Sequence, residues 1–199
     1  MKEKIEKLDY VKFCTDRLNK EEGANEWLVD CREKVHSAIG ILTEAQELIE
    51  SIEALDSYKE GCEQNGSDPF SDHMMERLVT EAVWEAGDVL FYFTILRSEF
   101  KLSTPELNTK PNFYPATDCL RSVSTQLLEL VKKYVFQNRK DLKKNILIKY
   151  NIAFNAFLAV LTDKLGVTVQ EVELVNKIKL SIRYPNGKFT SELSRNRKE

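Results

Sequence analysis

The sequence predicts an all-α protein, a helical bundle of about six helices, and three observations support this fold class. The 199-residue chain holds only 7 glycines and 5 prolines, so few residues interrupt a helix. Apolar residues recur at the spacing of a helix face, whereas the alternation typical of a half-buried strand is hardly visible. With 42% apolar residues the chain can bury a real core, and we expect a single domain over residues 1–199.

Six helices are expected in chain order, separated by segments that contain glycine, proline or polar residues. Residues that favour helix termini mark several of the bounds. Asn25 can cap the second helix and Gly61 suits its C-terminus, while Ser71 or Asp72 can cap the third. The expected bounds are residues 4–19, 26–60, 73–100, 116–138, 141–165 and 168–184.

The last helix has the clearest termini. Thr168 and Glu171 have the spacing of a capping box, in which each side chain accepts a hydrogen bond from the backbone of the other residue. Pro185 disfavours helical backbone in the residue before it, so the helix should end there.

Two acidic pairs with the same spacing lie inside otherwise apolar helices: Glu44 with Glu47, and Glu85 with Asp88. Residues three apart share a helix face, so each pair directs two carboxylates the same way. If the two helices pack side by side, four acids share one site, and they cannot all stay ionised in a dry crevice without a cation. Hard oxygen ligands suit Mg²⁺, so the sequence predicts a magnesium site.

A polar ridge lies in the last helix. Asn176, Lys179 and Arg183 stand on one face and present an amide and two cations. Cations near a helix C-terminus are also favoured by the helix dipole, so the ridge by itself is ambiguous. Beside an acidic metal site it fits a phosphate clamp, because Lys supplies a point charge and Arg a fork of donors.

A weak internal similarity gives a second interpretation of the chain. Residues 43–49 can be laid over residues 125–131, and residues 102–107 over residues 167–172. On this alignment Gln126 takes the place of Glu44, Tyr150 that of Glu85, and Ala153 that of Asp88. The chain would then be a duplicated helical hairpin whose second copy has lost the metal ligands. Alternatively, any two amphipathic helices match at this level, and both interpretations stay open.

Three motifs, taken together and in order, resemble a known enzyme family. They are Glu44-x-x-Glu47, then Trp84-Glu-Ala-Gly-Asp-Val-Leu-Phe-Tyr92, then Asn176-x-x-Lys179-x-x-x-Arg183-Tyr-Pro185. This set resembles the MazG-like, all-α nucleoside triphosphate pyrophosphohydrolases, whose relatives include dimeric dUTP and dCTP pyrophosphatases and phosphoribosyl-ATP pyrophosphohydrolase. The resemblance covers roughly residues 35–100 and 166–189.

The resemblance implies Mg²⁺-dependent hydrolysis of a nucleoside triphosphate to the monophosphate and pyrophosphate, in nucleotide-pool sanitation or dNTP control, with Mn²⁺ as a possible substitute. It also favours a homodimer, because relatives of this fold bury their helix pairs against a partner; alternatively, the second half of this chain covers the helix pair itself. Either Glu47 or Glu50 takes the proton of the attacking water, and the sequence does not choose between them. The matched metal ligands are Glu44, Glu47, Glu85 and Asp88, and the matched triphosphate-binding positions are Asn176, Lys179, Arg183 and Tyr184.

Two features depart from the compact members of that family. The separation of Glu47 from Glu85 is longer, and residues 101–165 insert an extra helical pair before the last helix. An inserted degenerate repeat, as in the dimeric dUTPase-like branch, would produce this arrangement around a four-helix catalytic core. The base specificity therefore stays open, and a dUTP, dCTP or phosphoribosyl-ATP specialist is an alternative.

Bulk composition favours a soluble protein that does not bind nucleic acid or membranes. The chain has 29 Lys and Arg against 32 Asp and Glu, a net charge of −3. The first ten residues lack the apolar core of a signal peptide, and the cysteines form no C-x-x-C pair, so we expect a cytoplasmic protein with reduced thiols. A non-catalytic helical module that keeps the acids for metal-dependent folding is the rival to the enzyme.

Overall fold

The computed structural model describes residues 26–69, 73–103 and 115–184. These residues form five α-helices and two short helical turns, and no strand occurs among them, so the all-α fold class is confirmed. The helix expected over residues 4–19 and the expected caps Asn25, Ser71 and Asp72 lie outside the described residues.

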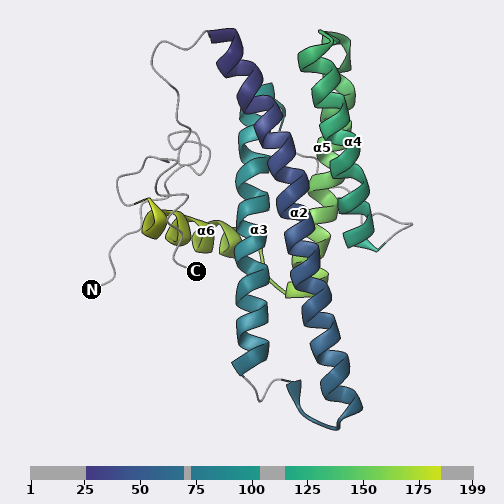
Figure 1. The fold of residues 1–199 in the computed structure, drawn as a ribbon, viewed down its shortest axis with the longest axis vertical. Helices are drawn as coiled ribbons and strands as arrows, with labels where there is room; N and C mark the ends of the chain where they lie inside the picture. Colours follow the sequence, from purple (N-terminus) through teal and green to yellow (C-terminus); the bar gives the residue numbers. More distant parts are fainter. Residues whose placement is uncertain (1–25, 70–72, 104–114, 185–199) are drawn as a thin grey trace.

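The first two helices form an antiparallel hairpin: α2 (Glu26–Gln64) and α3 (His73–Phe100) pack along much of their length (Figure 1). The expectation that α2 ends at Gly61 is wrong by about one turn. Gly66 has the positive φ of 68° that ends a helix, and the Ser67 N–H donates to the Cys62 carbonyl, so the glycine that reverses the chain lies further on.

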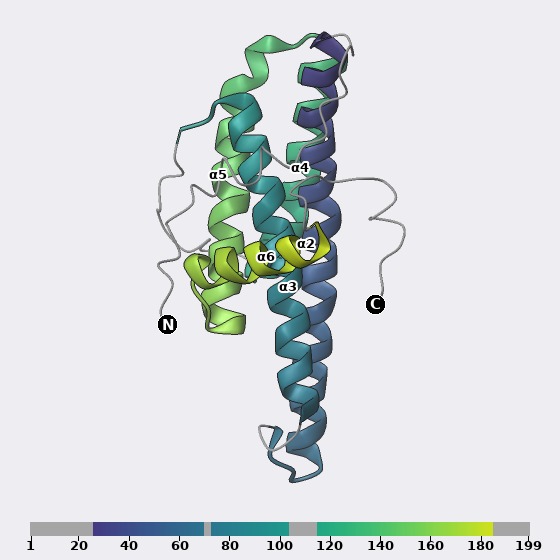
Figure 2. The ribbon, with the colours of Figure 1, turned by 90° about the vertical axis from the view of Figure 1, so that its left-hand side faces the viewer.

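A second hairpin lies against the first. It consists of α4 (Ala116–Phe136), the 3₁₀ turn η2 (Lys140–Leu142) and α5 (Lys143–Val160), and α4 packs on α2 (Figures 1 and 2). The helix expected over residues 141–165 changes at its end into the π-helical turn η3 (Leu161–Leu165), which Gly166 closes with a φ of 67°.

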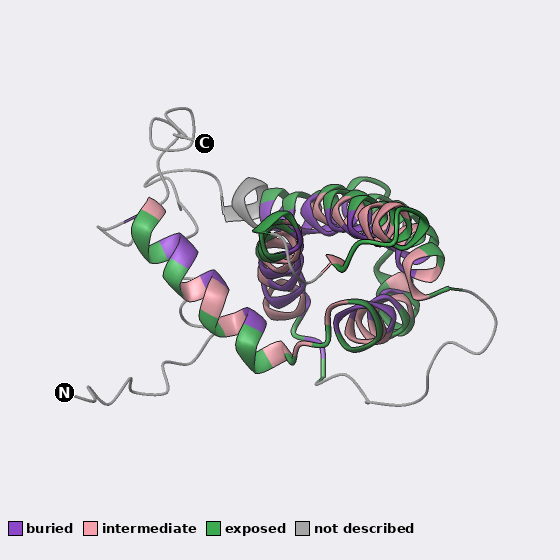
Figure 3. Cartoon of the chain, turned by 90° about the horizontal axis from the view of Figure 1, so that it is seen from below, coloured by how far each residue is buried: buried purple, intermediate pink, exposed green. Residues whose placement is uncertain are grey.

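The last helix, α6 (Val169–Arg183), crosses α3 on the side away from the second hairpin (Figures 1 and 3). Its expected capping box is confirmed: the Glu171 N–H donates to Thr168 Oγ1, and the Thr168 N–H donates to Glu171 Oε2 at 2.7 Å. The capping box fixes where the helix starts and therefore which face it turns to α3.

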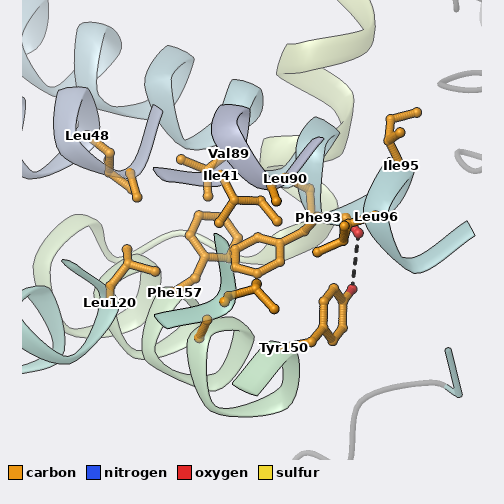
Figure 4. Packing of buried hydrophobic residues seen from close by; sticks show 14 of the residues in the cluster. Ile41, Leu48, Val89, Leu90, Phe93, Ile95, Leu96, Leu120, Tyr150 and Phe157 are labelled. Carbon is orange, nitrogen blue, oxygen red and sulfur yellow. Dashed lines mark hydrogen bonds between the residues drawn. The ribbon is translucent and has the colours of Figure 1, made fainter. Parts of the chain in front are cut away.

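Aromatic residues fill the core between the hairpins. Phe93 of α3 meets Tyr150 of α5 edge to face and packs against Phe157 (Figure 4). It also makes an edge-to-face contact with Phe154 of α5. The Tyr150 hydroxyl donates to the Phe93 carbonyl at 3.3 Å, and burial raises the pKa of this phenol. Tyr150 stands where the duplicated-hairpin alignment would place an acid, so this position of the second hairpin contributes to the core.

One described segment, Lys140–Leu165, is long and apolar enough to cross a membrane by length and composition, with a mean hydropathy of 1.3 over its most apolar window. The core helix of a soluble protein meets the same criteria, and α5 forms part of the core. The criteria alone therefore assign no location.

Candidate metal centre

Three carboxylates from two helices converge beside α6. Glu44 projects from the middle of α2, and Glu85 and Asp88 project from one face of α3. One oxygen from each of these three residues lies within 4.8 Å of the other two. The sequence thus correctly predicted that acids from two distant segments come together, and it did so for three of the four residues in the two pairs.

The other two candidate acids of α2 lie outside this group of three. Glu47 is exposed, but its charge raises the pKa values of Glu44 and Glu85, so it lies near the cluster. Glu50 is also exposed and accepts a hydrogen bond from Gln46 Nε2 at 2.8 Å. Because Gln46 in turn accepts from Arg121 of α4, Glu50 lies toward the α4 side of the helix.

A buried lysine of α6 reaches the cluster. Lys179 Nζ donates to Asp88 Oδ2 at 2.6 Å and to the Trp84 carbonyl at 3.1 Å, and its side chain is 6% exposed. The view in Figure 2 shows α6 lying across the α2–α3 hairpin, the arrangement that brings this lysine to the acids. The Trp84 carbonyl was not a candidate from the sequence, because a backbone acceptor leaves no signal in residue type.

The carboxylates carry more negative charge than Lys179 compensates. Burial, together with the charges of Asp88, Glu47 and Glu85, raises the pKa of Glu44 to about 7, and Lys179 opposes this rise. The pKa of Glu85 is also raised, chiefly by burial, although Lys179 and Arg183 lower it. Three carboxylates against one ammonium leave a formal charge of −2 when all are ionised.

The donor set fits a divalent cation. Converging carboxylate oxygens are the hard ligands that Mg²⁺ and Mn²⁺ take, and a cation there would offset the burial and the repulsion that together raise the pKa of Glu44 to about 7. Glu44, Glu85 and Asp88 are the residues that would hold it.

Two members of the polar ridge of α6 lie near the acids: Lys179, which bonds Asp88, and Arg183. Asn176 is fully buried, and neither its Nδ2 nor its Oδ1 has a hydrogen-bond partner among the described residues. Arg183 is half-buried, and its charge lowers the pKa of Glu85, so it lies near the cluster. Tyr184 is buried at the end of α6, where its N–H donates to the Leu180 carbonyl.

Two glycines allow close approach around the acids. A Cβ added at Gly87 would lie 2.7 Å from Asn176 Nδ2, and one added at Gly40 would lie 2.4 Å from the Tyr92 ring. The Tyr92 ring also meets the His36 imidazole edge to face, with centroids 5.5 Å apart. The α3–α6 crossing therefore depends on the absence of a side chain at Gly87.

We expect Gly87→Ala to lower the free energy of unfolding by about 1 to 3 kcal/mol, because the added methyl group must displace Asn176 and α6. Gly61→Ala is the matched control. No atom lies within 4 Å of a Cβ at Gly61, so this substitution should raise stability by about 0.5 to 1 kcal/mol through helix propensity. Urea denaturation of both variants measures the difference, and equal effects would contradict the close-packing explanation.

Comparison of the chain with known protein families, with curated proteins and with solved structures finds no match. The functional interpretation therefore rests on the site and on the motifs in the sequence.

Proposed function

We propose that the protein is a Mg²⁺-dependent nucleoside triphosphate pyrophosphohydrolase. The observation that supports this proposal is the meeting of Glu44, Glu85 and Asp88 with Lys179: carboxylates able to hold a cation lie beside an ammonium group able to bind phosphate. The three motifs that resemble the MazG-like family contain these same residues. A six-helix bundle with a four-helix catalytic core, the cytoplasm as location and a homodimer belong to the same proposal.

The residues have separate roles in the proposed reaction. Lys179 and Arg183 bind the triphosphate oxygens and balance the charge that develops on the leaving pyrophosphate. Asn176, with both polar atoms unpaired, offers a further donor if α6 adjusts. A bound Mg²⁺ supplies Lewis acidity toward phosphate oxygens and lowers the pKa of water.

The proposed chemistry is a single displacement. Water attacks the α phosphorus, the bond from that phosphorus to the bridging oxygen breaks, and pyrophosphate leaves. Glu47 is the preferred acceptor for the proton of the water, because its charge acts on the cluster while Glu50 bonds Gln46. Accordingly, Glu47→Gln should cost far more activity than Glu50→Gln.

A panel of NTPs and dNTPs with Mg²⁺ tests the proposed reaction. We expect pyrophosphate and a monophosphate as products, with no direct release of orthophosphate. The preferred base identifies a dUTP or dCTP specialist, and phosphoribosyl-ATP, assayed as a separate substrate, identifies a specialist for that compound. Mn²⁺ should replace Mg²⁺. Orthophosphate release alone would point to another phosphatase chemistry and contradict the proposal.

A non-catalytic helical module is the second candidate, favoured by one observation. The raised pKa of Glu44 means that a cation would stabilise the fold even without turnover. The same panel separates the two candidates: metal-dependent stabilisation without turnover of any triphosphate would favour the module.

A further inference from the structure

The turn between α4 and α5 concentrates positive charge. Residues 132–144 contain six Lys or Arg and one Asp, a local charge of +5 in a chain whose net charge is −3. We call this segment the basic tip. Its cationic residues, of which all but the half-buried Lys133 are exposed, are Lys132, Lys133, Arg139, Lys140, Lys143 and Lys144.

Ion pairs compensate only part of this charge. Lys132 and Lys133 share Glu129 at 3.4 Å each, and Arg139 pairs with Asp141 at 2.8 Å. Adding Glu129 to the count still leaves a surplus of +4. All of these pairs lie on an exposed surface, where such pairs contribute little and readily exchange for other anions.

Apolar side chains are exposed beside the cations. Phe136, the last residue of α4, is 67% exposed at the basic tip. Ile148 and Ile152 are 46% and 38% exposed, and they follow Lys144 at intervals of four residues on one face of α5. The surface is therefore basic at the turn and apolar immediately next to it.

We propose that the basic tip is a docking site for an anionic phospholipid surface. Lysine and arginine side chains near such a surface are attracted by its negative potential, and an exposed phenylalanine can enter the boundary between headgroups and acyl chains. The whole-chain charge gives no indication of this site, because the acidic residues elsewhere outweigh the tip.

The position and composition of the tip favour a lipid surface over nucleic acid. The tip is the turn of a helical hairpin at one end of the bundle (Figures 1 and 2), a place that a membrane surface can reach. Single-stranded nucleic acid is typically held in a basic groove with several stacking aromatics. Phe136 is the single strongly exposed aromatic residue of the described tip.

Docking at the tip leaves the acidic centre accessible. The tip lies at one end of the bundle, and α6 crosses the hairpin nearer its middle (Figure 1). Lipid binding is thus independent of whether the protein hydrolyses triphosphates.

Sedimentation with vesicles tests the inference. The full chain should bind vesicles in which phosphatidylserine replaces about a third of the phosphatidylcholine, and it should bind pure phosphatidylcholine at least about tenfold more weakly. Lys143→Glu with Lys144→Glu should abolish most of this binding. Phe136→Ser, which removes an exposed side chain, should weaken the part of the binding that persists in high salt.

The control is a double variant with the same change in net charge at the opposite end of the bundle, Lys59→Glu with Arg77→Glu, which should bind as the unmodified protein does. Circular dichroism checks that each variant is folded. The inference is overturned if the anionic vesicles do not bind, if neutral vesicles bind equally, or if both double variants behave alike. Binding of RNA or DNA through the tip, without vesicle binding, would also overturn it.

Discussion

Asp88→Asn is expected to reduce pyrophosphate release by at least about a hundredfold. The substitution replaces one of the three converging carboxylates with a neutral amide, which weakens the binding of a cation. A metal ion's stabilisation of the transition state amounts to several kcal/mol, and each 1.36 kcal/mol is a factor of about ten in rate. The substitution also removes the negative charge that Lys179 contacts, so the two acceptors of its ammonium, the amide oxygen and the Trp84 carbonyl, are both neutral. Initial rates with saturating Mg²⁺ and the best triphosphate of the panel measure the effect.

Glu76→Gln is the matched control for this variant. Glu76 is an exposed acid of the same helix, three turns before Asp88, where it lies near His73. Its substitution should leave the rate within about a factor of two, as expected for a surface residue. Near-normal turnover in Asp88→Asn, with the protein folded, would contradict the proposed centre.

The metal-free protein should lose stability as the pH rises from about 4.5 to about 7. In this window the folded state keeps on Glu44 a proton that the unfolded state has released, because the pKa is raised from 4.5 to about 7. The free energy of unfolding therefore falls with increasing pH, by about 1 to 2 kcal/mol once solvent screening of this partly exposed group is included. The raised pKa of Glu85 acts in the same direction.

Thermal unfolding at pH 5 and pH 8, with EDTA and with Mg²⁺, measures this dependence. Mg²⁺ should stabilise the protein more at pH 8, where the carboxylates are ionised and can bind it. Glu44→Gln should flatten the pH dependence in EDTA and weaken the stabilisation by Mg²⁺. The lowered pKa of Glu33 changes stability only at pH values below this window, so it does not obscure the pH dependence that comes from Glu44. A Mg²⁺ effect that is the same at both pH values would contradict the assignment of the ligands.

Much of the fold could be predicted because it follows from local patterns. Apolar periodicity identified the helices, and the Thr168 capping box located the start of α6 to the residue. The two acidic pairs could be recognised because spacing fixes which face each residue occupies. Their convergence required only that α2 and α3 pack as neighbours, which a short connection favours.

The parts that could not be predicted depend on contacts between distant segments. No local pattern indicates that Lys179 meets both Asp88 and a backbone carbonyl, or that Asn176 is buried without a partner. The predicted end of α2 was wrong because Gly61 lies inside the helix, with no atom within 4 Å of an added Cβ, while Gly66 has the left-handed backbone that ends the helix. Spacing alone could not separate Glu47 from Glu50 either, since that choice depends on the neighbouring α4.

The 2.6 Å contact between Lys179 and Asp88 gives one carboxylate two competing uses. The carboxylate tethers the final helix to the hairpin, and it is also one of the three that would hold a divalent ion. An ion that draws on the charge of Asp88 weakens this tether, so the ammonium becomes more available to an incoming phosphate, while its bond to the Trp84 carbonyl still joins α6 to α3. Filling of the centre and the exchange of the Lys179 ammonium between carboxylate and phosphate are therefore linked through one side chain, that of Asp88.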